Sequence, residues 1–314
     1  MDIFISICIP AYNSGAKLER LLDSIKIQTF TNYEIIVSDD SPNNSVKDII
    51  DQQYSDLNIQ YYHNDPPLGT PENWNNALRK SKGNWINLMH HDDWMLDENT
   101  LQTFVDHIGK DPGAKLIFCA FRNINTDNNT SSDGTASWFD LLLLKWNYLN
   151  LFKNFIGNPS CTLVSSELKP YAYDKRIKWL IDFDFYTWYF RREKKFTYIR
   201  KPLIAFRIHS NQVTAQSQKN PAVEIPESFI LYEKYGIGIL KNVFVYDFFW
   251  RMYRNLGIKN IKQLESYLGF ECPYPSIRNM ISAQNKISAG LLKKGYISKP
   301  LMLLAYLKNR IAGK

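Results

Sequence analysis

Cysteine is scarce in this sequence of 314 residues. The four cysteines, Cys8, Cys119, Cys161 and Cys272, stand far apart, and no two of them form a CxxC pair. This spacing argues against a zinc ribbon and against the disulfide framework of a small secreted protein. The cysteine pattern therefore favours a reducing compartment.

Long hydrophobic runs are missing as well. The purest apolar run, 301–307, is far shorter than the roughly 20 residues that a membrane-spanning helix needs. Residues 1–6 have no basic residue before their apolar stretch, so they do not resemble a signal peptide. We therefore expect a cytoplasmic protein.

Acidic residues are absent after Glu271, whereas eight basic residues follow it. The formal charge of the whole chain is +7, but residues 1–271 carry 30 basic residues against 31 acidic ones. A near-neutral body with a basic end argues against a nucleic-acid-binding protein and for local electrostatic attachment. Aromatic residues, at 14%, are too frequent for a disordered chain, and the length allows a sizeable core.

Strand and helix patterns alternate at the start of the chain. Apolar runs predict strands at 3–10, 33–38 and 59–63, and helical spacing predicts helices at 17–28 and 46–54. This alternation indicates an α/β fold with a mostly parallel central sheet. Ligands bind at the carboxyl ends of such strands, where the loops with Tyr12-Asn13 and Asp39-Asp40 fall.

The rest of the chain changes character near residue 215. Further strands are predicted at 84–89, 115–122, 160–165 and 196–209, and helices at 72–81, 101–108, 138–155 and 178–192, with a polar loop at 123–134. Helical periodicity dominates beyond residue 220. We therefore predict a domain at 1–215 and a mainly helical region at 216–314, whose basic amphipathic end covers 273–314.

The acidic pair Asp92-Asp93 leaves a predicted buried strand directly after His90 and His91. Carboxylates at a strand end can hold a hard divalent ion, which in turn neutralises phosphate oxygens. A solvated turn is the alternative interpretation. The pair Asp39-Asp40 ends another strand of the same predicted sheet, which favours the metal site.

A second acidic cluster, Asp182-Phe183-Asp184, lies in a strongly aromatic stretch with Trp179 and Trp188. Residues two apart on a helix point to different faces, so one of the two carboxylates is expected to face a site. Aromatic walls raise the pKa of a carboxylate through desolvation and suit it to act as a general base. The alternative is a solvated or capping aspartate, with the aromatic residues filling the core.

Together these motifs resemble the family 2 inverting glycosyltransferases of GT-A fold. The resemblance covers roughly residues 3–210. It rests on the segments SICIPAYN (6–13), QTF (28–30) and EIIVSDDS (34–41), on Asn64, Gly69 and Asn75, and on GNWI (83–86) with Asp92-Asp93.

The resemblance implies a role for individual residues. Nucleotide-binding positions would be Pro10, Tyr12, Asn13, Asp40, Asn75 and Asp92. A divalent metal, Mn²⁺ or Mg²⁺, would be held by Asp93 and His209, and Asp182 would be the catalytic base. Contacts to the donor or acceptor sugar would come from His91, Trp179, Asp184 and Trp188.

The implied reaction is the metal-dependent transfer of a hexose or N-acetylhexosamine from a nucleotide sugar, most simply UDP-linked, to a saccharide acceptor. The metal would stabilise the leaving nucleoside diphosphate. A base on the opposite face of the sugar would deprotonate the acceptor hydroxyl, so that one displacement inverts the anomeric centre.

The basic end, 286–314, contains two short apolar segments that Lys299-Pro300 separates. Lysine and arginine flank both, a pattern typical of helices that lie on an anionic membrane surface. The alternative is a helical pair packed on the body. Peripheral attachment at the inner face of the cytoplasmic membrane would suit an acceptor on a polyisoprenyl diphosphate, as in bacterial O-antigen or capsule synthesis.

Two other functions compete with this interpretation. A non-catalytic protein that binds sugar nucleotides or carbohydrates would explain why His91 and Ile181 stand where acidic residues are expected. A nucleotidyltransferase would place a glycine-rich phosphate loop after the first strand, whereas this chain has Ala11-Tyr12-Asn13-Ser14-Gly15.

Overall fold

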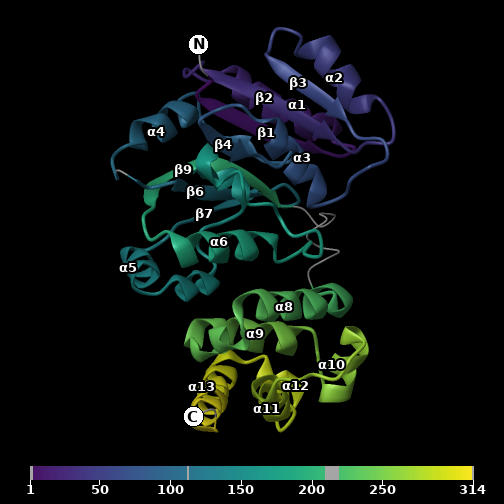
Figure 1. The fold of residues 1–314 in the computed structure, drawn as a ribbon, viewed down its shortest axis with the longest axis vertical. Helices are drawn as coiled ribbons and strands as arrows, with labels where there is room; N and C mark the ends of the chain where they lie inside the picture. Colours follow the sequence, from purple (N-terminus) through teal and green to yellow (C-terminus); the bar gives the residue numbers. More distant parts are fainter. Residues whose placement is uncertain (1–2, 112, 209–218, 313–314) are drawn as a thin grey trace. The chain divides into compact units, whose positions relative to one another are not determined.

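The computed structural model describes residues 3–111, 113–208 and 219–312. These residues form two compact units (Figure 1). The first, here called the sheet unit, comprises Met1–Lys145, Asn154–Lys175 and Trp188–Ser210. The second, the helical unit, comprises Trp146–Lys153, Arg176–Thr187 and Asn211–Lys314. Two segments that the sequence analysis assigned to the first domain thus belong to the helical unit.

The first half of the central sheet is parallel, in the strand order β3-β2-β1-β4. Its members are β1 (Ile5–Ala11), β2 (Tyr33–Asp39), β3 (Ile59–His63) and β4 (Trp85–Leu88). All seven residues of β1 are buried, as expected for a parallel strand that is covered on both faces. The predicted strands at 3–10, 33–38, 59–63 and 84–89 are therefore confirmed.

The second half of the sheet is mixed and continues in the order β8-β6-β9-β5. Its members are β8 (Thr162–Ser165), β6 (Leu116–Asn125), β9 (Thr197–Ile208) and β5 (Trp94–Met95). Strand β8 runs antiparallel to both β4 and β6, whereas β6 and β9 are parallel. The short β5 pairs with β9 immediately after Asp93, so β9 lies beside the predicted metal site.

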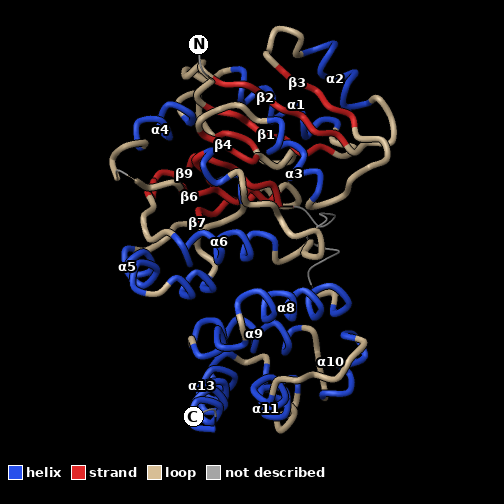
Figure 2. Tube along the Cα trace, in the orientation of Figure 1, coloured by secondary structure: helices blue, strands red, loops and turns tan. Residues whose placement is uncertain are grey.

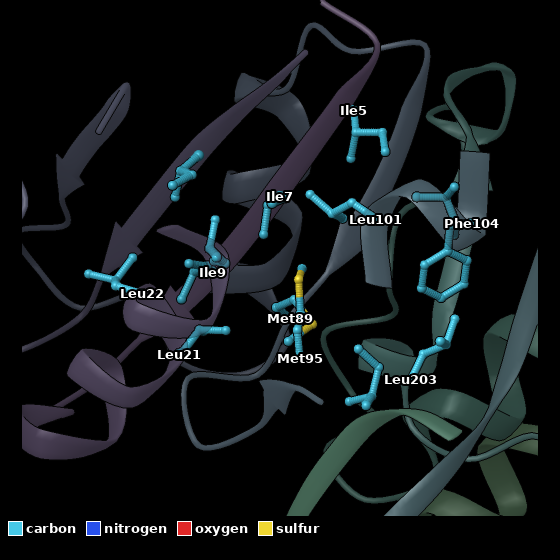
Figure 3. Close-up of a cluster of buried hydrophobic side chains, with 14 of the residues drawn as sticks. Ile5, Ile7, Ile9, Leu21, Leu22, Met89, Met95, Leu101, Phe104 and Leu203 are labelled. Carbon is cyan, nitrogen blue, oxygen red and sulfur yellow. The ribbon is translucent and has the colours of Figure 1, made fainter. Parts of the chain in front are cut away.

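Amphipathic helices cover the parallel half of the sheet. They are α1 (Gly15–Lys26), α2 (Ser45–Gln53), α3 (Glu72–Lys80) and α4 (Thr100–His107). Helix α1 buries Leu18, Leu21, Leu22 and Ile25, which share one face at helical spacing. Figure 3 shows Leu21 and Leu22 near Ile7 and Ile9 in the core of the sheet unit.

The loop predicted at 123–134 is instead a hairpin, in which β6 continues to Asn125 and pairs with β7 (Thr130–Gly134). Arg122 makes two hydrogen bonds to Asp133 across it, at 2.7 and 3.1 Å. Strand β7 is largely exposed and has no apolar alternation, so periodicity could not predict it.

The helix predicted at 138–155 is interrupted. Helix α5 (Trp138–Trp146) ends before Asn147, whose side chain accepts a hydrogen bond from the Leu149 amide at 3.0 Å and starts a new turn, η1 (Tyr148–Lys153). Two further 3₁₀ turns, η2 (Pro159–Cys161) and η3 (Ser166–Leu168), flank β8, and α6 (Ile181–Arg192) follows.

Beyond residue 219 the described chain is helices and loops (Figure 2). The elements are α8 (Pro221–Tyr235), η4 (Ile237–Lys241), α9 (Val243–Asn255), α10 (Ile261–Leu268), α11 (Pro275–Gln284), α12 (Ala289–Leu292) and α13 (Gly295–Ala312). Aromatic side chains fill the core of the helical unit, among them the fully buried Tyr232, Phe249 and Trp250. The predicted helical region is therefore confirmed.

Helix α13 corrects the prediction of two segments separated at Lys299-Pro300, because Pro300 lies inside one continuous helix. The backbone hydrogen bond that Pro300 lacks would run to the carbonyl of Tyr296. Both residues are exposed, so water can satisfy that carbonyl. No helix within the described residues has the length and apolar character needed to cross a bilayer.

Candidate active site

The carboxyl ends of β1 and β2 lie side by side at one edge of the sheet unit. Ala11 pairs with Asp39, and the Asp40 amide donates to the Ala11 carbonyl at 3.0 Å. Asn13 has a left-handed backbone (φ 46°), and its amide donates to the Ser41 hydroxyl at 2.9 Å. The structure thus joins the two polar loops that the sequence analysis placed at this edge.

Tyr12 and Pro10 differ in accessibility although they are two residues apart. The Tyr12 side chain is 55% exposed beyond the end of β1, so its ring is open to a ligand. Pro10 is buried, and its carbonyl lies 3.3 Å from Nδ1 of His91. This contact connects the end of β1 to the segment that follows β4.

Asp39 has a structural role. Its Oδ1 accepts hydrogen bonds from the amide and the hydroxyl of Ser41, and its Oδ2 accepts one from the Tyr61 hydroxyl at 2.8 Å. Burial and the neighbouring carboxylate raise the pKa of Tyr61 well above its usual range. Asp39 therefore fixes the turn after β2.

Asp40 holds the loop at 64–69 against the end of β2. Its Oδ1 accepts hydrogen bonds from Nδ2 of Asn64 at 2.9 Å and from the Leu68 amide at 3.0 Å, while its Oδ2 accepts one from the Gly69 amide at 2.7 Å. Gly69 has a φ of 70°, a conformation that favours glycine. Oδ2 thus retains capacity for a second donor.

Helix α3 contributes side-chain amides to the same edge. Asn64 donates to the Asn73 side chain at 3.1 Å and accepts a hydrogen bond from Asn76 at 2.9 Å. Asn73 also donates to the Ala11 carbonyl at 3.2 Å. The sequence analysis did not single out Asn73 or Asn76, although side-chain amides so close together in a short helix were a visible signal.

Asn75 serves a different purpose from the nucleotide contact that the resemblance implies. Its Nδ2 donates to the Tyr173 carbonyl at 2.9 Å, and its Oδ1 accepts from the Tyr173 amide at 2.8 Å. A second hydrogen bond joins Nδ2 to Glu72 at 3.0 Å. The protein therefore uses both ends of this buried amide to hold the chain at Tyr173.

Asp93 is buried at the end of β4 and is held by polar partners. Its Oδ2 accepts hydrogen bonds from Nδ2 of Asn158 at 2.9 Å and from the Ser160 hydroxyl at 2.6 Å. Burial, together with the charge of Asp92, raises its pKa well above the usual range. An opposing positive charge, such as a cation, would favour the ionised form of this carboxylate.

His90 faces Asp93. Its Nδ1 lies 3.8 Å from Oδ2 of Asp93 and 3.4 Å from Nδ2 of Asn158, and its ring contacts Trp74 with centroids 4.9 Å apart. Its Nε2 is buried and has no hydrogen-bond partner within the described residues. Burial lowers the pKa of His90 to about 4, so the ring is neutral near pH 7.

His90, Asp92 and Asp93 together form a candidate metal site. One ligand atom from each side chain lies within 4.8 Å of the other two. The nitrogen and carboxylate oxygens fit a divalent cation, and the buried Nε2 of His90 has no hydrogen-bond partner within the described residues. Asp93, a predicted metal ligand, thus belongs to this candidate site. The other predicted ligand, His209, lies outside the described residues.

Asp182 lies in the first turn of α6, within the helical unit. Its Oδ1 is buried and has no hydrogen-bond partner within the described residues. Burial raises the pKa of Asp182 to about 7. A carboxylate with this pKa can take up a proton near neutral pH, as a general base must.

Asp184 has quite different surroundings, as the spacing of the two aspartates predicts. Its carboxylate forms an ion pair with Lys234 at 2.5 Å and accepts a hydrogen bond from the Tyr235 hydroxyl at 2.6 Å. The side chain is almost fully buried, so it anchors α6 to α8 within the helical unit. This anchoring role replaces the sugar contact expected of Asp184.

The two predicted tryptophans lie in different units. Trp179 is half-buried in the helical unit, where its amide donates to Glu227 at 2.9 Å. Trp188 is half-buried in the sheet unit between Tyr171, with ring centroids 4.7 Å apart, and the guanidinium of Arg192.

The sheet order and the polar strand ends define an α/β protein of the GT-A type. Residues 6–217 match the family described as glycosyl transferase family 2, and the chain therefore belongs to that family. This confirms the resemblance found in the motifs.

Curated relatives match parts of the chain. An uncharacterised glycosyltransferase of Haemophilus influenzae is 31% identical over 36% of this chain, which spans 37% of that protein's length. An uncharacterised glycosyltransferase of Methanocaldococcus jannaschii is 24% identical over 65% of the chain and 70% of its own length. A Campylobacter jejuni protein named GalNAc(5)-diNAcBac-PP-undecaprenol beta-1,3-glucosyltransferase is 33% identical over 29% of the chain and 30% of its own length.

Solved structures share the fold at low sequence identity. Staphylococcus aureus TarS 1-349 in complex with UDP-GlcNAc has a TM-score of 0.64 and 13% identity, over 99% of this chain and 92% of that one. The mannosyltransferase PcManGT of Pyrobaculum calidifontis, in complex with GDP-Man and Mn²⁺, has a TM-score of 0.56 and 14% identity, over 99% and 87% of the two chains. The predicted GT-A fold is therefore confirmed.

Proposed function

We propose that this protein is an inverting glycosyltransferase that moves a hexose or N-acetylhexosamine from a UDP-linked donor to a saccharide acceptor. One observation carries the proposal: His90, Asp92 and Asp93 form a cluster that could hold a cation, at the sheet edge where Asp40 fixes a polar loop. The UDP-GlcNAc named in the TarS complex supports a uridine donor. The family membership supports the transfer reaction.

The donor nucleotide would lie across the ends of β1, β2 and β4. The exposed ring of Tyr12 can stack on the base, and Oδ2 of Asp40 can accept a hydrogen bond from the N–H of a pyrimidine. Pro10 and Asn13 would shape the same pocket from the β1 loop. Asp92, which is partly exposed, can contact the ribose or the donor sugar.

A divalent cation, Mn²⁺ or Mg²⁺, would neutralise the charge that develops on the leaving diphosphate. Asp93 and Asp92 supply carboxylate oxygens, and His90 supplies a nitrogen within the same cluster. The hydrogen bonds from Asn158 and Ser160 orient Asp93 before the cation binds. His209 is proposed as a further ligand from the chain after β9, and His91 as a contact to the donor sugar.

Asp182 would act as the general base. Its unpartnered Oδ1 can accept the proton of an acceptor hydroxyl while that oxygen attacks the anomeric carbon. Attack opposite the departing UDP inverts the configuration in a single displacement. The half-buried indoles of Trp179 and Trp188 offer apolar faces for sugar rings.

The acceptor is proposed to be a saccharide on a polyisoprenyl diphosphate, in the synthesis of a bacterial O-antigen, capsule or related glycan. The name of the Campylobacter jejuni relative, an undecaprenol-linked saccharide glucosyltransferase, supports this class of acceptor. Such an acceptor is held in a membrane, so the enzyme must work at its inner surface.

Helix α13 supports peripheral attachment to that membrane. Its exposed apolar residues lie on one arc of about 100° at 3.6 residues per turn. They are Tyr296, Leu303, Leu304, Leu307 and Ile311. Exposed basic residues flank this arc on both sides, namely Lys299, Lys308 and Arg310. An apolar stripe between cations fits the interface of an anionic bilayer.

A transfer assay with the full-length chain tests the proposal. Wild type is incubated with UDP-linked hexoses, Mn²⁺ and lipid-linked saccharide acceptors, and UDP release and product configuration are measured. We expect transfer with inversion, and a loss of at least 100-fold in kcat for Asp182→Asn. Binding of UDP, followed as a thermal shift, should be unchanged in this variant.

The assay also separates the competing functions. Binding of UDP without turnover for every donor and acceptor would favour a non-catalytic binding protein. Release of pyrophosphate from a nucleoside triphosphate and a sugar phosphate would identify a nucleotidyltransferase. Full transfer activity in Asp182→Asn would contradict the assignment of the base.

A further inference from the structure

We infer that His90 is the third protein ligand of the bound cation and that its imidazole makes the site prefer Mn²⁺ and similar transition metals over Mg²⁺. The inference rests on the proposed metal-dependent function and concerns the selectivity of the metal site.

The distances place His90 in the cluster. Ligand atoms that share an ion at about 2.1 Å are about 3 to 4.2 Å apart. Nδ1 of His90 lies 3.8 Å from Oδ2 of Asp93, within this range. The third member, Asp92, completes a set whose ligand atoms all lie within 4.8 Å of one another.

Protein contacts hold the ring of His90 in place, and Nδ1 lies 3.4 Å from Nδ2 of Asn158. Its backbone amide donates to the Ser160 hydroxyl at 3.0 Å, and the same hydroxyl donates to Asp93 at 2.6 Å. One serine thus orients both ligands. The contact with Trp74 fixes the ring plane, while Nε2 has no hydrogen-bond partner within the described residues.

His91 makes a different contact. Its Nδ1 lies 3.3 Å from the carbonyl of Pro10, so its ring is directed to the backbone of β1. His91 is absent from the metal-binding group found among the described residues. The two adjacent histidines thus provide a ligand and a matched control.

The donor set predicts the metal preference. Mg²⁺ favours oxygen ligands and near-ideal octahedral geometry, whereas Mn²⁺ and later transition metals accept imidazole nitrogen more readily. A site with one imidazole and two carboxylates therefore favours Mn²⁺ over Mg²⁺ more than a site with three carboxylates would. His90→Asp creates that comparison at the same backbone position.

Electron paramagnetic resonance tests the inference without an activity measurement. Mn²⁺ is titrated into the full-length protein with UDP present, free Mn²⁺ is quantified from its signal, and Mg²⁺ is added as a competitor. We expect His90→Ala to weaken Mn²⁺ binding about tenfold and His91→Ala to leave it unchanged. In His90→Asp, we expect the preference for Mn²⁺ over Mg²⁺ to fall about tenfold. Coupling of Mn²⁺ to a ¹⁴N nucleus should be present in wild type and His91→Ala and absent from both His90 variants.

Two outcomes would overturn the inference. One is Mn²⁺ binding in His90→Ala at the affinity of wild type while Asp93→Asn weakens it, which would leave a site made of carboxylates alone. The other is a ¹⁴N coupling that persists in folded His90→Ala. In either case, transfer activity of the wild type with Mn²⁺ would leave the proposed function intact, whereas the absence of transfer would argue against the function itself. Circular dichroism confirms that each variant is folded.

Discussion

The raised pKa of Asp182 predicts that this carboxylate lowers the stability of the fold above neutral pH. The carboxyl group of an unfolded chain has a pKa of about 3.9, whereas burial raises that of Asp182 to about 7. The folded state therefore binds this proton more tightly than the unfolded state does. Ionisation of Asp182 costs nothing below the unfolded pKa and reaches its full cost above pH 7.

The magnitude follows from linkage. The cost is about 1.5 kcal/mol at pH 5 and about 4 kcal/mol at pH 8, a difference of about 2.6 kcal/mol. Asp182 is partly exposed, so solvent screening reduces the difference to about 2 kcal/mol. Asp182→Asn removes the ionisation and keeps the shape of the side chain. The free energy of unfolding of the variant, relative to wild type, should therefore be about 2 kcal/mol higher at pH 8 than at pH 5.

Denaturant unfolding of both proteins at pH 5 and pH 8 measures this difference. Asp184→Asn is the matched control, because it lies on the same helix but removes the partner of Lys234. We expect this control to lose about 3 kcal/mol of stability at both pH values. If the effect of Asp182→Asn were the same at pH 5 and pH 8, Asp182 would not have the raised pKa that its role as a base requires.

Two other predictions concern the donor loop and the membrane. Asp40→Asn should weaken UDP binding about tenfold, as measured by calorimetry. The reason is that an amide nitrogen in place of one carboxylate oxygen cannot accept the hydrogen bond from the Leu68 or the Gly69 amide. The control Asp51→Asn, an exposed change on α2, should leave UDP binding unchanged. The double variant Leu304→Asp/Leu307→Asp should no longer sediment with phosphatidylglycerol vesicles. The control Lys47→Gln, far from α13 in sequence, should sediment as wild type does. Equal sedimentation of wild type, the double variant and the control would rule out α13 as the attachment site.

The sequence predicted the parallel half of the sheet because β1 and β2 are almost entirely buried and α1 carries a regular apolar stripe. The hairpin at Thr130–Gly134 escaped prediction, since a polar and exposed strand leaves no periodic signal. Pro300 indicated a break in the C-terminal helix. The helix continues through Pro300 because the carbonyl left without a hydrogen bond is exposed to water.

At the site, the sequence identified the acidic residues at the strand ends but not the separate role of each aspartate in a pair. Asp39 and Asp40 are equivalent in a sequence pattern, and only tertiary contacts show that Asp39 fixes a turn while Asp40 holds the loop at 64–69. His90 rather than His91 is the proposed metal ligand partly because its amide bonds to Ser160, which lies 70 residues further along the chain. Likewise, Lys234 and Tyr235 from α8 engage Asp184, and neither could be paired with it from spacing.

The chain alternates between the two units along its sequence. It passes from one to the other at five points, because Trp146–Lys153 and Arg176–Thr187 belong to the helical unit. Phe152 and Phe183 from these segments pack against Phe248 of α9. A chimera with another member of the family, joined once near residue 210, would therefore combine aromatic core residues from two parents. Exchange of the helical unit therefore requires all three of its segments to be transferred together.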